Sequence, residues 1–349
     1  MPAIGCGRGR RAGAAYRDWL PRTAALILGT LALASAFIAA YVGALHKPDP
    51  RDVPVAVVTN DQQAQAVMSG VRARTDTIKP VGYDSLDAAS DGLNDRSVYA
   101  VLSSAPDGGL TLATASAGAP AASELVTGVF TEAARQAGVP LQVTDDVPVS
   151  ADDPRGLVPF YLAVGVVLGG YLASTALGIS LGTSPRSLRR AGLRIATLAV
   201  HAILLGVIGA ILVGPVLGVF AGHVATVAVV GALATFAAGM VAAAVQGWLG
   251  LLGTGIVILL LVVLGNPGSG GIYAPEFLPP FLRGMHRWNV PGLATDLFKS
   301  AIYFDWRGGG WALTGLLLWV LAGLAGLLTA TMFRARRRPP PGRHAADRG

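Results

Sequence analysis

Four arginines in one short stretch are the residues of this chain best suited to binding a charged partner. Arg186, Arg189, Arg190 and Arg194 lie within 183–194, a stretch without acidic residues that joins two apolar segments. Their spacing favours one face of a short amphipathic helix. We interpret this helix as a candidate docking element for a partner subunit. An ordinary basic loop beside anionic lipid is the alternative.

A glycine-rich run further along the chain is the second candidate site. It opens the connection 266–310, which precedes the last apolar segment, and it contains Asn266, Pro267, Ser269, Gly270 and Gly271. Within this connection, the pattern of 290–303 predicts an amphipathic helix lying at the membrane surface. Two interpretations stay open for the connection: a structural loop with an interfacial helix, or a gate over the exit of a transported substrate.

The sequence contains no residue set that suits catalysis, a metal ion or a bound cofactor. Cys6 is the single cysteine, and the aspartates are scattered at expected turns and helix caps. None of the three lysines follows a glycine, so the phosphate-binding pattern Gly-x-x-x-x-Gly-Lys-[Ser/Thr] does not occur. We therefore expect no enzyme activity in this chain. Any ATP and Mg²⁺ that drive it would bind to a partner subunit.

Six long apolar segments must position these sites: 23–45, 157–182, 195–220, 224–247, 248–265 and 311–333. A helix needs about 20 residues to cross a hydrocarbon core, so we expect a polytopic helical membrane protein with six spans. The segments contain no Asp, Glu, Lys or Arg. Ion-coupled transporters and intramembrane enzymes need buried ionisable groups, which disfavours both classes. The uncharged turn 245–249 leaves open whether the fourth and fifth segments cross completely.

The charged residues between the spans predict the orientation. Residues 1–22 hold five arginines and one acid, and 334–349 hold six arginines and one acid. In contrast, 46–156 hold eight basic and fifteen acidic residues. By the positive-inside rule, both termini and the stretch 183–194 face the cytoplasm, and 46–156 lie outside. The basic excess of the chain therefore reflects topology and anionic lipid, not nucleic acid.

Residues 46–156 are long enough for one small extracytoplasmic domain of the α/β or α+β class. We expect strands at 53–59, 81–83, 97–103, 110–115 and 141–144, and helices at 64–74, 85–93 and 121–136. The turn Pro-Asp-Gly-Gly at 106–109 predicts a hairpin between the third and fourth strands. Ser85 or Asp84 would cap the second helix.

Small residues in the spans predict close helix packing. Gly165 with Gly169, and Gly218 with both Gly214 and Gly222, have the spacing that lets helix backbones approach each other. Pro215 predicts a kink near the outer end of the third span.

The layout as a whole resembles the membrane subunits of type 2 ABC exporters, in the branch similar to phage infection protein. The resemblance rests on one span, an outer domain that begins VPVAVVTND at 53–61, and then five spans. Two further runs support it, DPRGLVPFY at 153–161 and GNPGSGG at 265–271. It implies a dimeric permease in a bacterial cell membrane that works with a separate nucleotide-binding ATPase. The arginine stretch would be its coupling region.

We therefore expect the permease subunit of an ATP-driven exporter of lipidic, amphipathic or envelope-related material. Its divisions are a basic N-terminus 1–22, a first transmembrane helix 23–45, an outer domain 46–156, a five-helix membrane domain 157–333 and a basic tail 334–349. The alternative is a non-transporting envelope scaffold or surface receptor, for which the outer domain alone would suffice.

Overall fold

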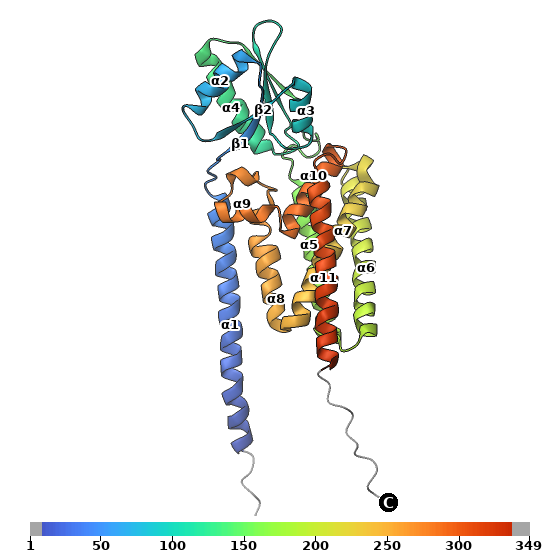
Figure 1. The fold of residues 1–349 in the computed structure, drawn as a ribbon. Helices are drawn as coiled ribbons and strands as arrows, with labels where there is room; N and C mark the ends of the chain where they lie inside the picture. The colour runs from blue at the N-terminus through green and yellow to red at the C-terminus, as the bar shows by residue number, and fades with distance from the viewer. Residues whose placement is uncertain (1–8, 337–349) are drawn as a thin grey trace, which may run out of the picture.

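The computed structural model describes residues 9–336 and shows an α/β domain stacked on one end of a helical bundle (Figure 1). Helix α1 (Gly9–Leu45) enters the α/β domain from below, and helix α11 (Gly310–Arg336) leaves it in the opposite direction. Parts of both predicted basic ends, 1–8 with Cys6 and 337–349, lie outside the described residues.

The α/β domain contains one mixed sheet with the strand order β2-β1-β3-β4-β5. The strands are β1 (Val53–Val58), β2 (Ile78–Tyr83), β3 (Ala100–Ser104), β4 (Leu110–Thr114) and β5 (Leu141–Asp145). All neighbouring pairs are parallel except β3 with β4, which form the predicted hairpin. Each expected strand is present, and β2 begins earlier than its short predicted segment.

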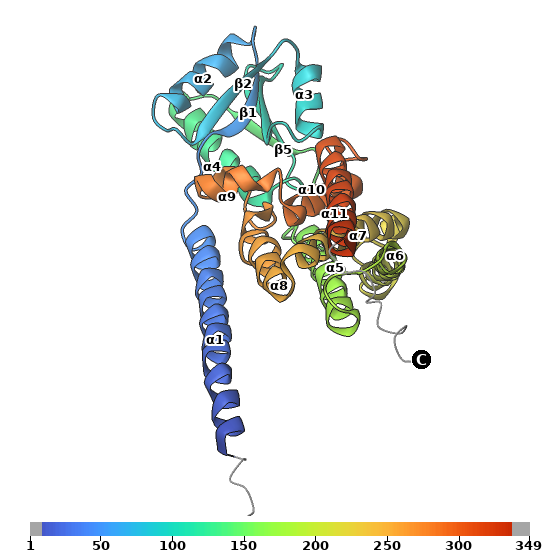
Figure 2. The ribbon, with the colours of Figure 1, turned by 60° about the horizontal axis from the view of Figure 1, so that its bottom comes forward.

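Three helices cover the two faces of this sheet (Figure 2). Helices α2 (Gln62–Arg72) and α4 (Pro120–Ala137) pack on the face that carries Val55, and α3 (Leu86–Asn94) packs on the face that carries Ala56. Alternate residues of a strand point to opposite faces, so β1 contributes side chains to the hydrophobic core on each face of the sheet. The Ser85 hydroxyl accepts the Ala88 N–H at 3.1 Å, which confirms one of the two predicted caps.

Within residues 9–336, five helices are long and apolar enough to cross a membrane, which agrees with a polytopic helical membrane protein. They are α1 over Thr23–Leu45, α5 (Val158–Leu181), α6 (Leu188–Ile211) with its continuation, α7 (Val224–Leu249) and α11. Helix α7 is the centre of the bundle, because α5, α6 and α11 all pack against it. Helix α1 stands apart from these four (Figure 1).

The sixth expected span is shorter than a membrane crossing requires. Segment 248–265 divides at Gly250, whose φ of +63° ends α7. It continues as α8 (Leu251–Ile258) and a π-helical turn (Leu259–Leu264). Helix α8 and the π-helical turn together are shorter than the roughly 20 residues that a membrane crossing needs. Trp248 and Leu249, the first residues of the predicted segment, belong to α7 instead.

The arginine stretch does not form a separate amphipathic helix. Gly182, at φ +85°, ends α5, a bend follows, and α6 begins at Leu188 with Ser187 as its cap. Arg194 is therefore inside a candidate span, contrary to the expectation that the spans hold no charge. Further along α6, Pro215 lies in a π-helical turn, at the position where a kink was predicted.

Helix α10 (Val290–Tyr303) has the predicted bounds but not the predicted surface position. Almost all of its residues are buried between the α/β domain and helices α5, α7 and α11 (Figure 1). A helix at the membrane surface would leave its polar face in water. The two charged residues of α10, Asp296 and Lys299, have hydrogen-bond partners inside the protein, so this face can be buried.

Of the predicted glycines, Gly169 packs closely against the Leu205 side chain of α6, but the closest approaches to a helix backbone use glycines outside the predicted pairs. A Cβ atom at Gly206 of α6 would collide with the backbone of Ala228 on α7, and one at Gly170 of α5 would collide with the Thr235 carbonyl. A Cβ atom at Gly165, in contrast, would meet no atom within 4 Å. Helix α7 thus approaches α5 and α6 this closely only because these two positions lack a side chain.

We expect Gly206→Ala to lower the free energy of unfolding by about 2 kcal/mol, since overpacking a close contact forces the backbones apart. Gly165→Ala is the matched control, and it should be neutral or stabilising by up to about 1 kcal/mol through helix propensity. Unfolding of both variants in detergent, followed by circular dichroism, checks this. Equal midpoints for the two variants would contradict the assigned α6–α7 contact.

Candidate functional site

The exposed arginines of the α5–α6 connection lie at the end of the bundle away from the α/β domain (Figure 1). Arg186 lies in the bend, and Arg189 and Arg190 lie in the first turn of α6. Arg186 and Arg190 line a cavity of about 840 Å³ that also includes Arg334 of α11. The structure thus brings the predicted basic stretch and the start of the predicted basic tail to one site.

Arg194, predicted as a docking residue, is turned inward and is only 3% exposed. Its guanidinium donates to the carbonyl oxygens of Gly182 (3.2 Å), Thr183 (3.0 Å) and Ser174 (2.9 Å), and to Gln246 Oε1 (3.3 Å). These acceptors belong to the end of α5, the bend and α7. Arg194 therefore fixes the connection that presents the other three arginines.

The second predicted site, Asn266, Pro267, Ser269, Gly270 and Gly271, is buried in the structure. A Cβ atom at Gly271 would collide with Phe160 at the start of α5, and one at Gly270 would come within 2.7 Å of the His286 ring. The Asn289 amide donates to the Gly268 carbonyl at 3.1 Å. The segment therefore packs tightly between α5, α9 (Pro280–His286) and α10. Its role as a gate stays a prediction.

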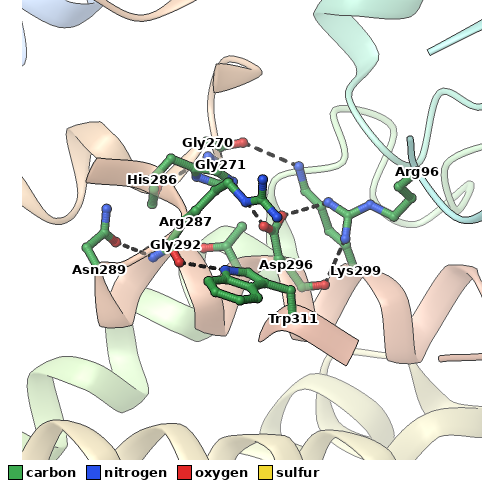
Figure 3. Close-up of polar contacts among 12 residues, drawn as sticks. Arg96, Gly270, Gly271, His286, Arg287, Asn289, Gly292, Asp296, Lys299 and Trp311 are labelled. Carbon is green, nitrogen blue, oxygen red and sulfur yellow. Dashed lines mark hydrogen bonds and ion pairs between the residues drawn. The ribbon is translucent and has the colours of Figure 1, made fainter. Parts of the chain in front are cut away.

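An ion network that was not predicted from the sequence joins the α/β domain to the bundle (Figure 3). Arg96, from the loop after α3, forms an ion pair of 2.7 Å with Asp296 of α10. The same guanidinium donates to the Ser300 hydroxyl at 2.9 Å. His286 Nε2 lies 2.9 Å from the other carboxylate oxygen of Asp296. One carboxylate thus connects α10 to both α9 and the α/β domain.

Lys299 makes a second connection one turn further along α10. Its ammonium group is buried and donates to the carbonyl oxygens of Gly118 (2.9 Å) and Gly270 (3.5 Å). Gly118 lies between β4 and α4, and Gly270 belongs to the second predicted site (Figure 3). A single side chain therefore joins the sheet domain, α10 and the glycine-rich segment.

The surroundings shift the pKa values of both charged groups on α10. Burial alone would raise the pKa of Asp296, but the charges and hydrogen bonds of His286 and Arg96 hold it well below its ordinary value. Burial, and then the charge of Arg96, lower the pKa of Lys299 to about 8. Asp296 thus stays ionised in the folded protein, whereas Lys299 loses its proton at a mildly alkaline pH.

The residues that follow α10 also hold the α/β domain to the bundle, through apolar and ionic contacts. Phe304, directly after α10, is buried in the core formed by the sheet and α3. Arg307 then donates to Asp95 at 2.9 Å and to Asp91 at 2.7 Å, both at the end of α3. Arg96 itself has a φ of +58°, an unusual conformation for a residue other than glycine. The connection between α10 and α11 is thus part of the α/β domain's packing.

One sequence feature could have indicated that α10 is buried. Asp296 and Lys299, three residues apart, are the only charged residues in 290–303. Two opposite charges on one face of an otherwise apolar helix indicate a buried helix with a polar partner. Nothing in the sequence identified Arg96, two hundred residues earlier, as that partner. No group of His, Cys, Asp or Glu side chains that would hold a metal ion occurs among the described residues.

Comparisons with protein-family models, with curated proteins and with solved structures find no significant match to this chain.

We expect Asp296→Asn to lower the free energy of unfolding by about 3 kcal/mol, because it leaves Arg96 without a counter-ion in a largely buried position. Asp84→Asn, an exposed change in the α/β domain, is the control and should change the free energy of unfolding by no more than about 0.5 kcal/mol. Thermal unfolding of the purified protein in detergent measures both. A wild-type midpoint for Asp296→Asn would show that the ion pair does not hold the junction together.

The stability of the protein should rise with pH between about 8 and 10.5, the folded and ordinary pKa values of Lys299. In this range the unfolded chain binds more protons at this residue than the folded chain does, so raising the pH favours folding. Lys299→Met should remove this part of the pH dependence. Thermal midpoints of the two proteins at several pH values test this, and parallel curves would contradict it.

Proposed function

We propose that this chain is the permease subunit of an ATP-driven exporter of lipidic, amphipathic or envelope-related material, of the type 2 ABC class. A separate ATPase would dock on the α5–α6 connection. The observation that supports this most directly is the placement of Arg186, Arg189 and Arg190. They are exposed at the end of the bundle away from the α/β domain, on a connection that Arg194 fixes in place. In the proposed orientation this end faces the cytoplasm and 46–156 lie outside.

The arginines are in a position that calls for a negatively charged partner. The N-terminus of a helix carries a partial positive charge, so each basic residue in its first turn is unfavourable by about 0.3–1 kcal/mol. No acidic residue lies in the first turn of α6. Lipid phosphates or an acidic protein surface would compensate this charge. The cavity between Arg186, Arg190 and Arg334 favours a protein, because it provides a recess for an inserted element.

The network around Arg194 supplies a route from the proposed docking site into the bundle. The amide of Gln246 on α7, which Arg194 contacts, donates to Thr175 of α5 at 2.9 Å and to Thr254 of α8 at 3.2 Å. A displacement of the α5–α6 connection would therefore move α5 and α7 together. Both helices pack against α10 at the other end of the bundle. Through these contacts, ATP-driven movement would reach the junction with the α/β domain.

The proposal also includes a second permease subunit, which would pair with this chain. The span Thr23–Leu45 of α1 is largely exposed within the single chain, apart from Ala44 at its end, and Leu31 and Ile38 are more than half exposed. Part of this surface would face a second copy of the chain, and lipid would cover the remainder. The resemblance to dimeric permeases is the basis of this part of the proposal.

We expect the combined change Arg186→Glu, Arg189→Glu and Arg190→Glu to abolish association with the ATPase, since it reverses the charge of the docking surface. The matched control is Arg72→Glu, Arg74→Glu and Lys79→Glu, which makes the same charge change on exposed positions of the α/β domain. Affinity purification of each tagged protein in mild detergent, with quantitative mass spectrometry, measures the nucleotide-binding subunit that remains bound.

Association retained by the first variant would refute the docking assignment. If the wild-type chain also brings down no ATPase while other membrane complexes survive, the envelope scaffold or receptor becomes the better interpretation. In that case the α/β domain, placed on an unrelated membrane anchor, should retain the activity.

A further inference from the structure

The junction between the α/β domain and the bundle contains a cavity of about 620 Å³. It is lined by residues from the loop after α3, from 270–287, from α10 and from the start of α11. The ion network of Arg96, His286 and Asp296 forms one wall, and Lys299 and Arg287 also line it (Figure 3). None of these groups has a place in the proposed docking of an ATPase, which would occur at the other end of the bundle.

The cations of this cavity are not all neutralised. Asp296 is engaged by Arg96 and His286, and Asp95 is engaged by Arg307, which lies outside the lining. Glu276, the third acid of the lining, accepts the Tyr99 hydroxyl at 2.7 Å, and this bond from a neutral phenol does not offset a carboxylate charge. Arg283, which also lines the cavity, lies 3.8 Å from Asp52 outside it. Two lining cations without a carboxylate partner remain, one on Arg287 and one on Lys299.

Neither Arg287 nor Lys299 has a carboxylate oxygen within 4 Å among the described residues. Lys299 uses two of its three N–H donors on backbone carbonyls, so one donor remains. Two unpaired cations in a partly enclosed cavity attract an anion more strongly than the same charges in open water, because the local dielectric is lower.

Arg287 is held in place for such a contact. Its guanidinium lies 5.2 Å from the centre of the Trp311 ring, and the Trp311 indole N–H donates to the Arg287 carbonyl at 2.8 Å (Figure 3). Stacking on an aromatic ring leaves the edge of a guanidinium free to donate hydrogen bonds to a phosphate. A fork of donors that lines the same cavity as an ammonium group is a suitable site for a phosphate-type anion.

Trp311, at the start of α11, connects the lining of the cavity to the apolar surface of the bundle. Trp288 is 60% exposed, and its ring meets that of Trp311 at 5.0 Å. Tryptophan rings favour the headgroup level of a membrane. Leu318 lies seven residues after Trp311, on the same face of α11, and is 52% exposed. A molecule with its charged group in the cavity would therefore have an apolar surface for its chains directly along α11.

We propose that the junction cavity binds a phosphate-type anion, presented as the headgroup of an acidic amphiphile in the adjoining leaflet, with Arg287 and Lys299 as its counter-charges. A free phosphate ion has the same charge chemistry, and the experiment below distinguishes the two sources. The site goes beyond the proposed function, since an exporter and a surface receptor could each use it. Its test needs no ATPase, so failure of one proposal leaves the other standing.

The test measures binding to the full-length chain in phosphatidylcholine nanodiscs. Three probes are titrated at constant ionic strength by microscale thermophoresis: dihexanoyl-phosphatidylglycerol, dihexanoyl-phosphatidylcholine and inorganic phosphate. We expect the phosphatidylglycerol to bind at least tenfold more tightly than the other two. Arg287→Gln should weaken this binding about tenfold, because a hydrogen bond to a charged group is lost. Lys299→Met should act in the same direction.

Arg72→Gln, an exposed change on α2, is the matched control and should bind as the wild type does. Thermal midpoints confirm that each variant is folded, and Arg287→Gln serves as the decisive variant because its side chain is outside the buried network. Tight binding of inorganic phosphate that Arg287→Gln abolishes would keep the anion site and assign it to a soluble ligand. Equal affinity for both lipids, or no effect of Arg287→Gln, would overturn the proposal.

Discussion

The ion pair between Arg96 and Asp296 is the interaction on which the arrangement of the two halves depends. It joins a loop of the α/β domain to α10, over a sequence separation of two hundred residues. The carboxylate is shared with His286, so the same group fixes α9 to α10. Charged groups are rarely buried without partners, because their desolvation is unfavourable by several kcal/mol. The pair therefore specifies where the α/β domain lies as well as stabilising it.

This constraint explains why α10 is buried rather than lying at the membrane surface. Once its charged face meets the α/β domain, its apolar residues pack against α5, α7 and α11. Phe304 then enters the core between the sheet and α3, and Lys299 reaches a carbonyl beside α4. The α/β domain is thus a fixed extension of the bundle and not a module on a flexible stalk.

At each end of the bundle, an arginine side chain donates hydrogen bonds to acceptors on neighbouring segments. At one end Arg194 satisfies carbonyls of α5 and of the following bend, and at the other Arg96 satisfies acceptors on α10. Helices α5 and α7 extend between these two networks and contact both α6 and α10. In the proposed exporter, this continuity connects the docking site of the ATPase to the junction cavity, where the two unpaired cations lie.

The sequence by itself determined the local elements and indicated a polytopic helical membrane protein. The continuous apolar run in 53–59, the turn at 106–109 and the long apolar segments each depend on near neighbours, so their strand, hairpin and helices were predictable. The split of 248–265 was not, because a turn at Gly250 changes which residues belong to which helix. Only the tertiary structure decided that Arg194 faces inward, that α10 is buried and that Arg96 pairs with Asp296. Each of these depends on a partner distant in the chain, and a single sequence contains no signal for the distance between two charged residues in space.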